Sequence, residues 1–163
     1  MMSTIAERRT IKTWSSIPSR IRRATAGLEE RNLDLRGGSE GWSIRETVHH
    51  LVEANLVASN IVLAALGRPD CRYDWSWVTP DTGWMKRLGY DKAPLEPALG
   101  LLDALCAHVA SVLEHAPAGL RRTVRLLDTP DGRLRRRTVR KVLAEECDHA
   151  RHHLRDIEAI RKP

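Results

Sequence analysis

The sequence predicts a single all-α domain, a four-helix bundle with a long aromatic loop between its second and third helices. A chain of 163 residues fits one domain, because one hydrophobic core is enough for this length. Hydrophobic residues make up 42% of the chain, yet aromatic residues only 4% and Phe is absent, so the core must consist of Leu, Val, Ile and Ala. That composition favours helices, since strands recruit aromatic residues. Four segments repeat apolar residues at helical spacing, which is the number a bundle requires.

The first two expected helices lie between helix-breaking residues. The first spans roughly residues 18 to 36, from Pro18 to the Gly37-Gly38 pair, and has one apolar face. The second begins after Ser43 and ends before Gly67. Its opening, Ser43-Ile44-Arg45-Glu46, is a capping box in which the serine hydroxyl and the glutamate carboxylate bind backbone amides reciprocally. The second helix is therefore the best defined in the sequence. The apolar face of the first helix consists of Ile21, Ala24, Leu28 and Leu35.

The third and fourth helices follow from apolar periodicity, at roughly residues 95 to 115 and from about Thr138 to Arg161. Residues 67 to 93, between the second and third helices, form a loop longer than a compact bundle needs. We expect this loop either to cover a pocket as a lid or simply to pack against the bundle. Before the fourth helix, Pro130-Asp131-Gly132 predicts a short hairpin or a turn. The loop holds most of the aromatic residues: Tyr73, Trp75, Trp77, Trp84 and Tyr90.

The chain is basic, with a net charge of +6 and a pI of about 9.7. This charge permits nucleic acid or other anionic partners. Arginine runs are usually solvated, and no helix-turn-helix or RNA-binding motif accompanies this one, so nucleic-acid or anion binding is kept only as a non-enzymatic alternative. The arginines concerned are Arg121, Arg122, Arg125, Arg133, Arg135, Arg136, Arg137 and Arg140.

Cysteine usage and hydropathy indicate a cytoplasmic protein. The three cysteines, Cys71, Cys106 and Cys147, are widely spaced and form neither a disulfide framework nor a zinc knuckle pattern. The N-terminal sequence lacks the apolar stretch of a signal peptide. The longest apolar stretch, residues 56 to 66, is too short to cross a bilayer. We therefore expect no membrane partner.

Helical spacing separates the histidines into inward-facing and outward-facing residues, because positions three, four and seven apart share one face. His50 shares its face with small and apolar residues of the second helix. His149 and His153 are four residues apart on the fourth helix, on a face that includes Val142 and Ile157. These three histidines are predicted to point into the bundle. Three others are predicted at the boundary, in solvent and in the core, respectively: His49, His152 and His108.

The three inward-facing histidines predict a mononuclear metal site. Two imidazoles at i and i+4 with a third from a facing helix hold a divalent transition metal and leave coordination positions open. Such an ion lowers the pKa of a bound water or thiol and so yields a nucleophile near neutral pH. Glu146, one turn before His149, is the candidate catalytic residue, as proton acceptor or as the group that orients the site. Cys147 points away from this face and is expected to be a small core residue, as is Cys106.

Two stretches, GWSIRETVHHLVEA (residues 41–54) and HARHHLRDI (residues 149–157), resemble the DinB-like superfamily of four-helix metalloproteins, in particular its YfiT-like members, which are assigned as metal-dependent hydrolases. Those proteins share a Trp-Ser-(apolar)-Arg-Glu opening, a His eight residues after the Trp, and a late HxxxH. Here these positions are Trp42, His50, and His149 with His153.

The resemblance implies zinc, nickel or another divalent ion, a small-molecule substrate and a homodimer. It also implies either hydrolysis or S-transfer from a low-molecular-weight thiol such as mycothiol or bacillithiol. For thiol transfer, the basic segment of residues 121–141 could hold a carboxylate-bearing cofactor. This chain departs from the family pattern in that basic segment and in its lack of Phe.

A di-iron carboxylate bundle is a further alternative, because Glu46-x-x-His49 and Glu146-x-x-His149 are ExxH motifs on two helices. That site would leave His50 and His153 unexplained. A metallopeptidase is not expected, since His149 lacks the glutamate that HExxH places after its first histidine. The di-iron site would also need glutamates from the other two helices, for which the chain offers Glu29, Glu30, Glu96 and Glu114.

Overall fold

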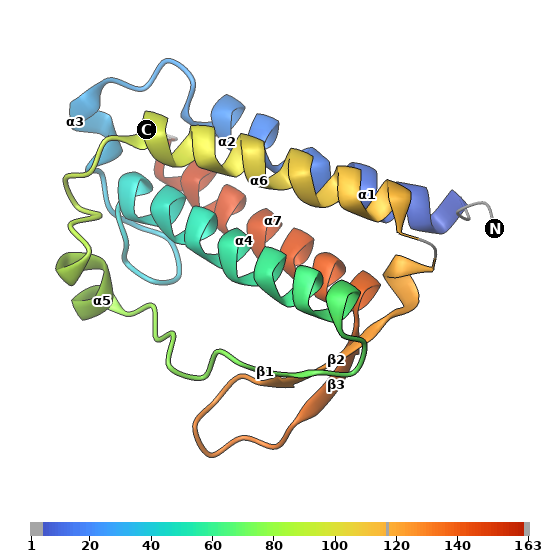
Figure 1. The fold of residues 1–163 in the computed structure, drawn as a ribbon. Helices are drawn as coiled ribbons and strands as arrows, with labels where there is room; N and C mark the ends of the chain where they lie inside the picture. The colour runs from blue at the N-terminus through green and yellow to red at the C-terminus, as the bar shows by residue number, and fades with distance from the viewer. Residues whose placement is uncertain (1–4, 117, 162–163) are drawn as a thin grey trace.

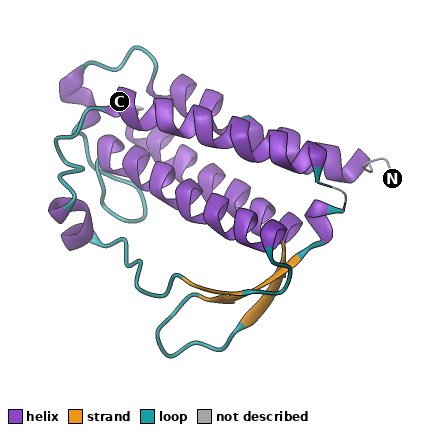
Figure 2. Cartoon of the chain, in the orientation of Figure 1, coloured by secondary structure: helices purple, strands orange, loops and turns teal. Residues whose placement is uncertain are grey.

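A computed structural model describes residues 5–116 and 118–161, which form a helical bundle with a small sheet at one end (Figures 1 and 2). The α-helices are α1 (Ile5–Ser15), α2 (Ile17–Thr25), α3 (Glu30–Leu33), α4 (Ile44–Gly67), α5 (Thr82–Arg87), α6 (Leu95–His115) and α7 (Val139–Arg161). A 3-10 turn, η1 (Gly119–Arg121), precedes the last two of three strands, β1 (Arg72–Asp74), β2 (Thr123–Leu127) and β3 (Arg135–Thr138).

The bundle has four helical segments: α1 continued by α2, then α4, α6 and α7. α4 packs against both α6 and α7, and α1 and α2 pack against the same two helices. Figure 1 shows α1 and α2 following one another beside α6, with α4 and α7 forming the other pair. The predicted four-helix bundle is confirmed. Its core is mainly aliphatic, as the composition predicts, and includes the fully buried Ile21, Val48, Leu51, Leu102 and Leu143.

The first helix differs from the prediction in both of its ends. The segment formed by α1 and α2 begins at Ile5, well before Pro18, and ends at Thr25 instead of residue 36. It stops there because Gly27, two residues later, adopts a left-handed φ of +73°, a conformation that a continuing helix does not allow. Leu35, which the prediction placed on the apolar face of this helix, lies after the end and is 45% exposed.

The other three helices, α4, α6 and α7, begin and end within a residue or two of the predicted positions. At the start of α4, the Glu46 amide donates to Ser43 Oγ at 3.1 Å, and the Ser43 amide donates to the Glu46 carboxylate at 2.8 Å. The predicted capping box is therefore confirmed. α6 has the predicted bounds, and α7 starts one residue after the predicted Thr138.

Among the described residues, α4 and α6 are long and apolar enough to cross a membrane by length and composition alone. In α4, 56% of the apolar stretch is buried inside the fold, and in α6 33%. Core helices of globular bundles pass the same test, and both of these helices pack against the bundle. The apolar length is therefore weak evidence for a membrane segment.

The connections between the bundle helices contain a three-stranded sheet with the order β1-β2-β3. β2 and β3 form the antiparallel hairpin that was one of two predicted alternatives. β1, which the sequence pattern does not predict, pairs in parallel with β2, so that Tyr73 lies opposite Leu126. β2 contacts α4, and β3 contacts α7. The aromatic loop thus contains a strand and a short helix, α5, and its first part is fixed to β2.

Candidate metal site

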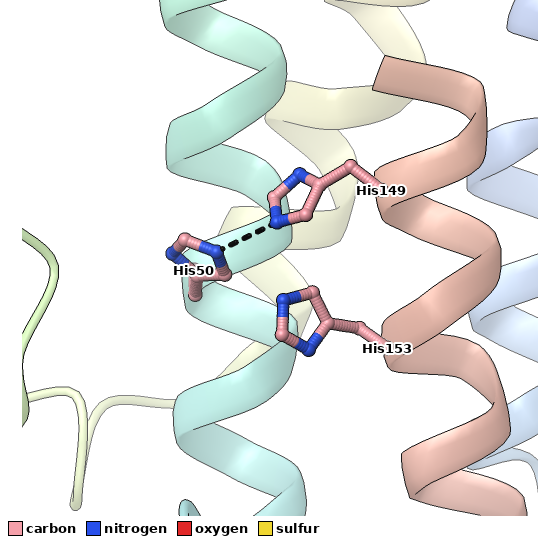
Figure 3. Close-up of side chains that lie close together, drawn as sticks. All are labelled: His50, His149 and His153. Atoms are coloured by element: carbon pink, nitrogen blue, oxygen red, sulfur yellow. Dashed lines mark hydrogen bonds between the residues drawn. The ribbon is translucent and has the colours of Figure 1, made fainter. Parts of the chain in front are cut away.

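Three imidazoles converge between α4 and α7. His50 projects from α4 toward His149 and His153, which lie one turn apart on α7 (Figure 3). His50 Nε2 lies 3.0 Å from His149 Nε2, and ligand atoms of all three residues lie within 4.8 Å of one another. The ring centroids are 4.7–5.0 Å apart. The structure therefore brings together the three histidines that helical spacing selects.

Two of these imidazoles, those of His50 and His153, are held in their neutral form. Burial, together with the neighbouring His149 and His153, lowers the pKa of His50 to about 3. Burial and His149 likewise lower the pKa of His153 to about 4, against the opposing effect of Asp156. A neutral imidazole offers a lone pair to a cation. Near neutral pH each of these two histidines therefore has an unprotonated ring nitrogen that can bind a metal ion.

Carboxylates orient the two histidines of α7 from behind. Glu146 accepts from His149 Nδ1 at 3.2 Å, and Asp156 Oδ2 lies 3.5 Å from His153 Nδ1. With its Nδ1 proton directed at Glu146, His149 turns the lone pair of Nε2 toward His50. Burial raises the pKa of Glu146. Asn55, fully buried on α4, donates to Glu146 Oε1 at 2.9 Å and so fixes that carboxylate in place.

The donor set fits a transition metal. Two nitrogen ligands at 2.0–2.1 Å from one tetrahedral ion lie about 3.3 Å apart, close to the observed spacing of His50 and His149. Hydrogen bonds from ligand imidazoles to carboxylates are also usual in such sites. Among the described residues, none forms a hydrogen bond with the buried His50 Nδ1, so the hydrogen-bonding contact of this ring is the one that faces His149.

The remaining histidines occupy surroundings that spacing predicts only in part. His152 is half-exposed, as predicted, although its Nε2 lies 3.0 Å from Ser39 Oγ. His49, predicted at the boundary, is buried, its Nε2 is 3.1 Å from the Ala93 carbonyl, and it stacks on Tyr90. His108, predicted in the core, is exposed on α6, because the buried face of that helix runs through other positions.

The cysteines and the glutamate of the capping box take no part in the cluster. Cys106 and Cys147 are buried core residues, as predicted, and burial raises the pKa of both thiols. Glu46 is used by the capping box and by an ion pair with Arg36 at 2.8 Å. Since His49 also turns away toward Ala93, the first ExxH motif of the di-iron alternative is not assembled.

A cavity of about 630 Å³ lies beside the three histidines, a volume typical of a small-molecule site. Trp75 and Val78 of the aromatic loop line it, as does Leu126 of β2. Trp77 is 67% exposed, so only part of the aromatic loop faces the cavity.

Several neighbours of the three histidines were not predicted to belong to the site. The Trp42 ring lies 4.8 Å from that of His50 and stacks at 5.8 Å on that of His153. Asn55 carried a signal in the sequence, because it is a polar residue on the apolar face of α4. Glu53 and Asp156 carried none, since exposed carboxylates at helical spacing are common.

The arginine segment is not a free cationic surface. Five of its eight guanidinium groups pair with carboxylates among the described residues: Arg121 with Glu7, Arg125 and Arg136 with Asp70, Arg135 with Asp128, and Arg137 with Glu145. Such pairing weakens the nucleic-acid alternative, because each paired guanidinium would have to exchange its carboxylate for a phosphate.

Comparison with known protein families identifies relatives across nearly the whole chain. A profile described as the DinB superfamily matches residues 13–157. A Geobacillus kaustophilus protein named "Putative metal-dependent hydrolase GK0616" is 31% identical over 149 residues, which are 90% of this chain and 79% of the relative. A Geobacillus thermodenitrificans protein named "Putative metal-dependent hydrolase" is 27% identical over 159 residues, 93% of this chain and 84% of the relative.

Among solved structures, the fold matches YfiT from Bacillus subtilis, described as "a probable metal-dependent hydrolase with an unusual four-helix bundle topology". The TM-score is 0.83 at 18% sequence identity, and the match covers 98% of this chain and 88% of the other. At that identity the match supports the fold.

Proposed function

This chain belongs to the DinB superfamily, and from that premise we propose that it is a metal-dependent hydrolase whose divalent ion is held by His50, His149 and His153. The observation that carries the proposal is the convergence of three imidazoles, two buried and one half-buried, with ligand atoms within 4.8 Å of one another, beside a cavity of small-molecule size. The names of the relatives point to the same chemistry. Zinc and nickel are the ions we expect, because both accept imidazole ligands.

A bound divalent ion supplies a Lewis acid that polarises a substrate carbonyl and lowers the pKa of water. The residues of the chain prepare the site for it. Glu146 accepts a hydrogen bond from His149 Nδ1, and Asn55 donates a hydrogen bond to Glu146. Glu146 is therefore better suited to orienting His149 than to exchanging protons with a substrate, since both of its oxygens already accept hydrogen bonds. Trp42 packs on two of the imidazoles and excludes water from that side.

Thiol transfer would use the same ion with a low-molecular-weight thiol. The pairing of the arginines argues against it: Arg135 and Arg137 line the cavity, but both are already paired with carboxylates. A carboxylate-bearing thiol would have to displace one of these partners. This observation favours hydrolysis.

The first test is metal content by plasma mass spectrometry on tag-free protein reconstituted with zinc or nickel. We expect about one ion per chain in the wild type and a loss of that ion in both His50→Ala and His153→Ala. His108→Ala is the matched control, because it removes an exposed helical histidine away from the cluster. Full metal content in both site variants, or no metal in the wild type after reconstitution, would refute the site.

The second test separates the two reactions. Metal-loaded protein is assayed with hydrolysable esters and amides, and with an electrophile in the presence of thiols. Hydrolysis that is lost in His50→Ala supports the proposal, whereas turnover only in the presence of a thiol would replace it with S-transfer.

A further inference from the structure

The cavity beside the histidines differs in charge from the protein as a whole. The chain carries a net charge of +6, yet the two arginines that line the cavity are neutralised by neighbouring carboxylates. Arg135 pairs with Asp128, and Arg137 lies 3.4 Å from Glu145. Those two carboxylates line the cavity as well, so both pairs belong to its wall. The two pairs together contribute no net charge to the cavity.

Glu53, which also lines the cavity, is a carboxylate without such a partner. Among the described residues, no Lys, Arg or His forms an ion pair with it within 4.0 Å. Its polar contact is with the Trp84 indole, whose Nε1 donates to the two carboxylate oxygens at 3.0 and 3.1 Å. Burial raises the pKa of Glu53, as expected for a carboxylate partly removed from water without a cation beside it.

The position of Glu53 is defined by the elements around it. It lies on α4, one turn beyond His50, and so on the same side of that helix as the metal cluster. Trp84 is held in turn, because Asp81 caps α5 and accepts the Trp84 amide at 2.6 Å. One indole N–H cannot satisfy both oxygens of an ionised carboxylate, which retains acceptor capacity for a ligand.

The surface next to Glu53 is apolar. Val57 and Ile61 continue along α4 from Glu53, and Leu126, Val142 and Trp75 complete this wall from the sheet, α7 and the loop. An apolar wall beside a half-buried carboxylate, with which none of the described cations pairs, selects a ligand by shape and by charge together.

We propose that this cavity binds molecules with an apolar body and a cationic nitrogen, in which the ammonium group pairs with Glu53 and the body lies along the apolar wall. The cavity also contains the histidines, so these molecules would be substrates if the proposed function holds. Their binding does not depend on it. A substrate of this class would be an apolar amine that carries an ester or amide group elsewhere in the molecule, so that the amine nitrogen stays protonated.

The test uses three probes of equal chain length, n-hexylammonium, hexanol and hexanoate, titrated into metal-free protein and followed by calorimetry and by tryptophan fluorescence. We expect n-hexylammonium to bind about tenfold more tightly than hexanol, the factor of one charge-assisted hydrogen bond, and hexanoate to bind more weakly than either. Glu53→Gln, which keeps the shape of the side chain, should remove the preference for n-hexylammonium over hexanol. Glu158→Gln removes an exposed helical carboxylate and should leave the preference unchanged.

A second variant guards against a folding defect in Glu53→Gln. Trp84→Phe removes the indole donor but keeps the carboxylate, so n-hexylammonium should still bind more tightly than hexanol. Equal or tighter binding of hexanoate, a preference that survives Glu53→Gln, or no binding of any probe would each overturn the proposal. Because the probes are measured without metal, such a result leaves the metal stoichiometry as a separate question.

Discussion

Acidification should destabilise the metal-free protein through the two most buried histidines of the cluster. In the native state the pKa of His50 is about 3 and that of His153 about 4, mainly because burial penalises the imidazolium form. Unfolding returns each ring to its ordinary pKa of 6.5. As the pH falls below 6.5, the unfolded chain therefore binds two protons that the native protein does not bind. The stabilisation is fully present above this pH and is lost as the pH falls toward the native pKa values.

The size of the effect follows from linkage. Each histidine contributes about 1.4 kcal/mol per pH unit once the pH is well below 6.5. Between pH 7 and pH 5 each ring lowers the free energy of unfolding by about 2 kcal/mol, and the pair by about 4 kcal/mol. Glu146 acts in the opposite direction, since its raised pKa lets the native state bind a proton more readily. The total change with pH thus combines several groups, and the histidine contribution must be isolated by difference.

Urea unfolding in EDTA at pH 7, 6 and 5 provides that difference. His50→Ala changes the absolute stability, but its loss of stability between pH 7 and pH 5 should be about 2 kcal/mol smaller than that of the wild type. His108→Ala, at an exposed position, should retain the wild-type dependence. If His50→Ala loses stability with falling pH as steeply as the wild type, His50 is not a buried neutral imidazole, and this reading of the cluster is wrong.

Three further substitutions test the surroundings of the site. Asn55→Leu should weaken zinc binding about 10- to 100-fold in a chelator competition, because Glu146 loses the donor that fixes it, and unchanged affinity would contradict that role. Gly38→Ala should lower the free energy of unfolding by at least about 1–2 kcal/mol. Gly38 has a φ of +72°, and an added Cβ would lie 2.8 Å from the Asp156 Cβ, so wild-type urea stability would refute this packing. Ser43→Ala should cost about 1 kcal/mol in the same measurement through loss of the helix cap, and no cost would contradict it.

The bundle could be predicted where helix ends have local causes. The capping box at Ser43 fixes the start of α4, and the apolar periodicity of α6 and α7 fixes their bounds. The prediction of the first helix was wrong because the apolar face of that helix starts upstream, at the buried Ile11 and Trp14. Charged and polar residues dominate the sequence there. The parallel pairing of β1 with β2 joins segments about 50 residues apart, and helical or strand periodicity carries no information on such a contact.

The site divides in the same way. The three histidines were predictable, because helical spacing alone decides which side chains of α4 and α7 share a face. The role that we propose for Glu53 was not, because it depends on a loop that brings Trp84 to the carboxylate and, among the described residues, no cation with it. The arginine segment shows the converse. Its charges could be counted in the sequence, but the hairpin folds Arg135 onto Asp128, and α7 presents Glu145 to Arg137. A net charge sums residues, whereas a ligand meets only the charges that the fold leaves unpaired, so a basic chain can present an acidic cavity.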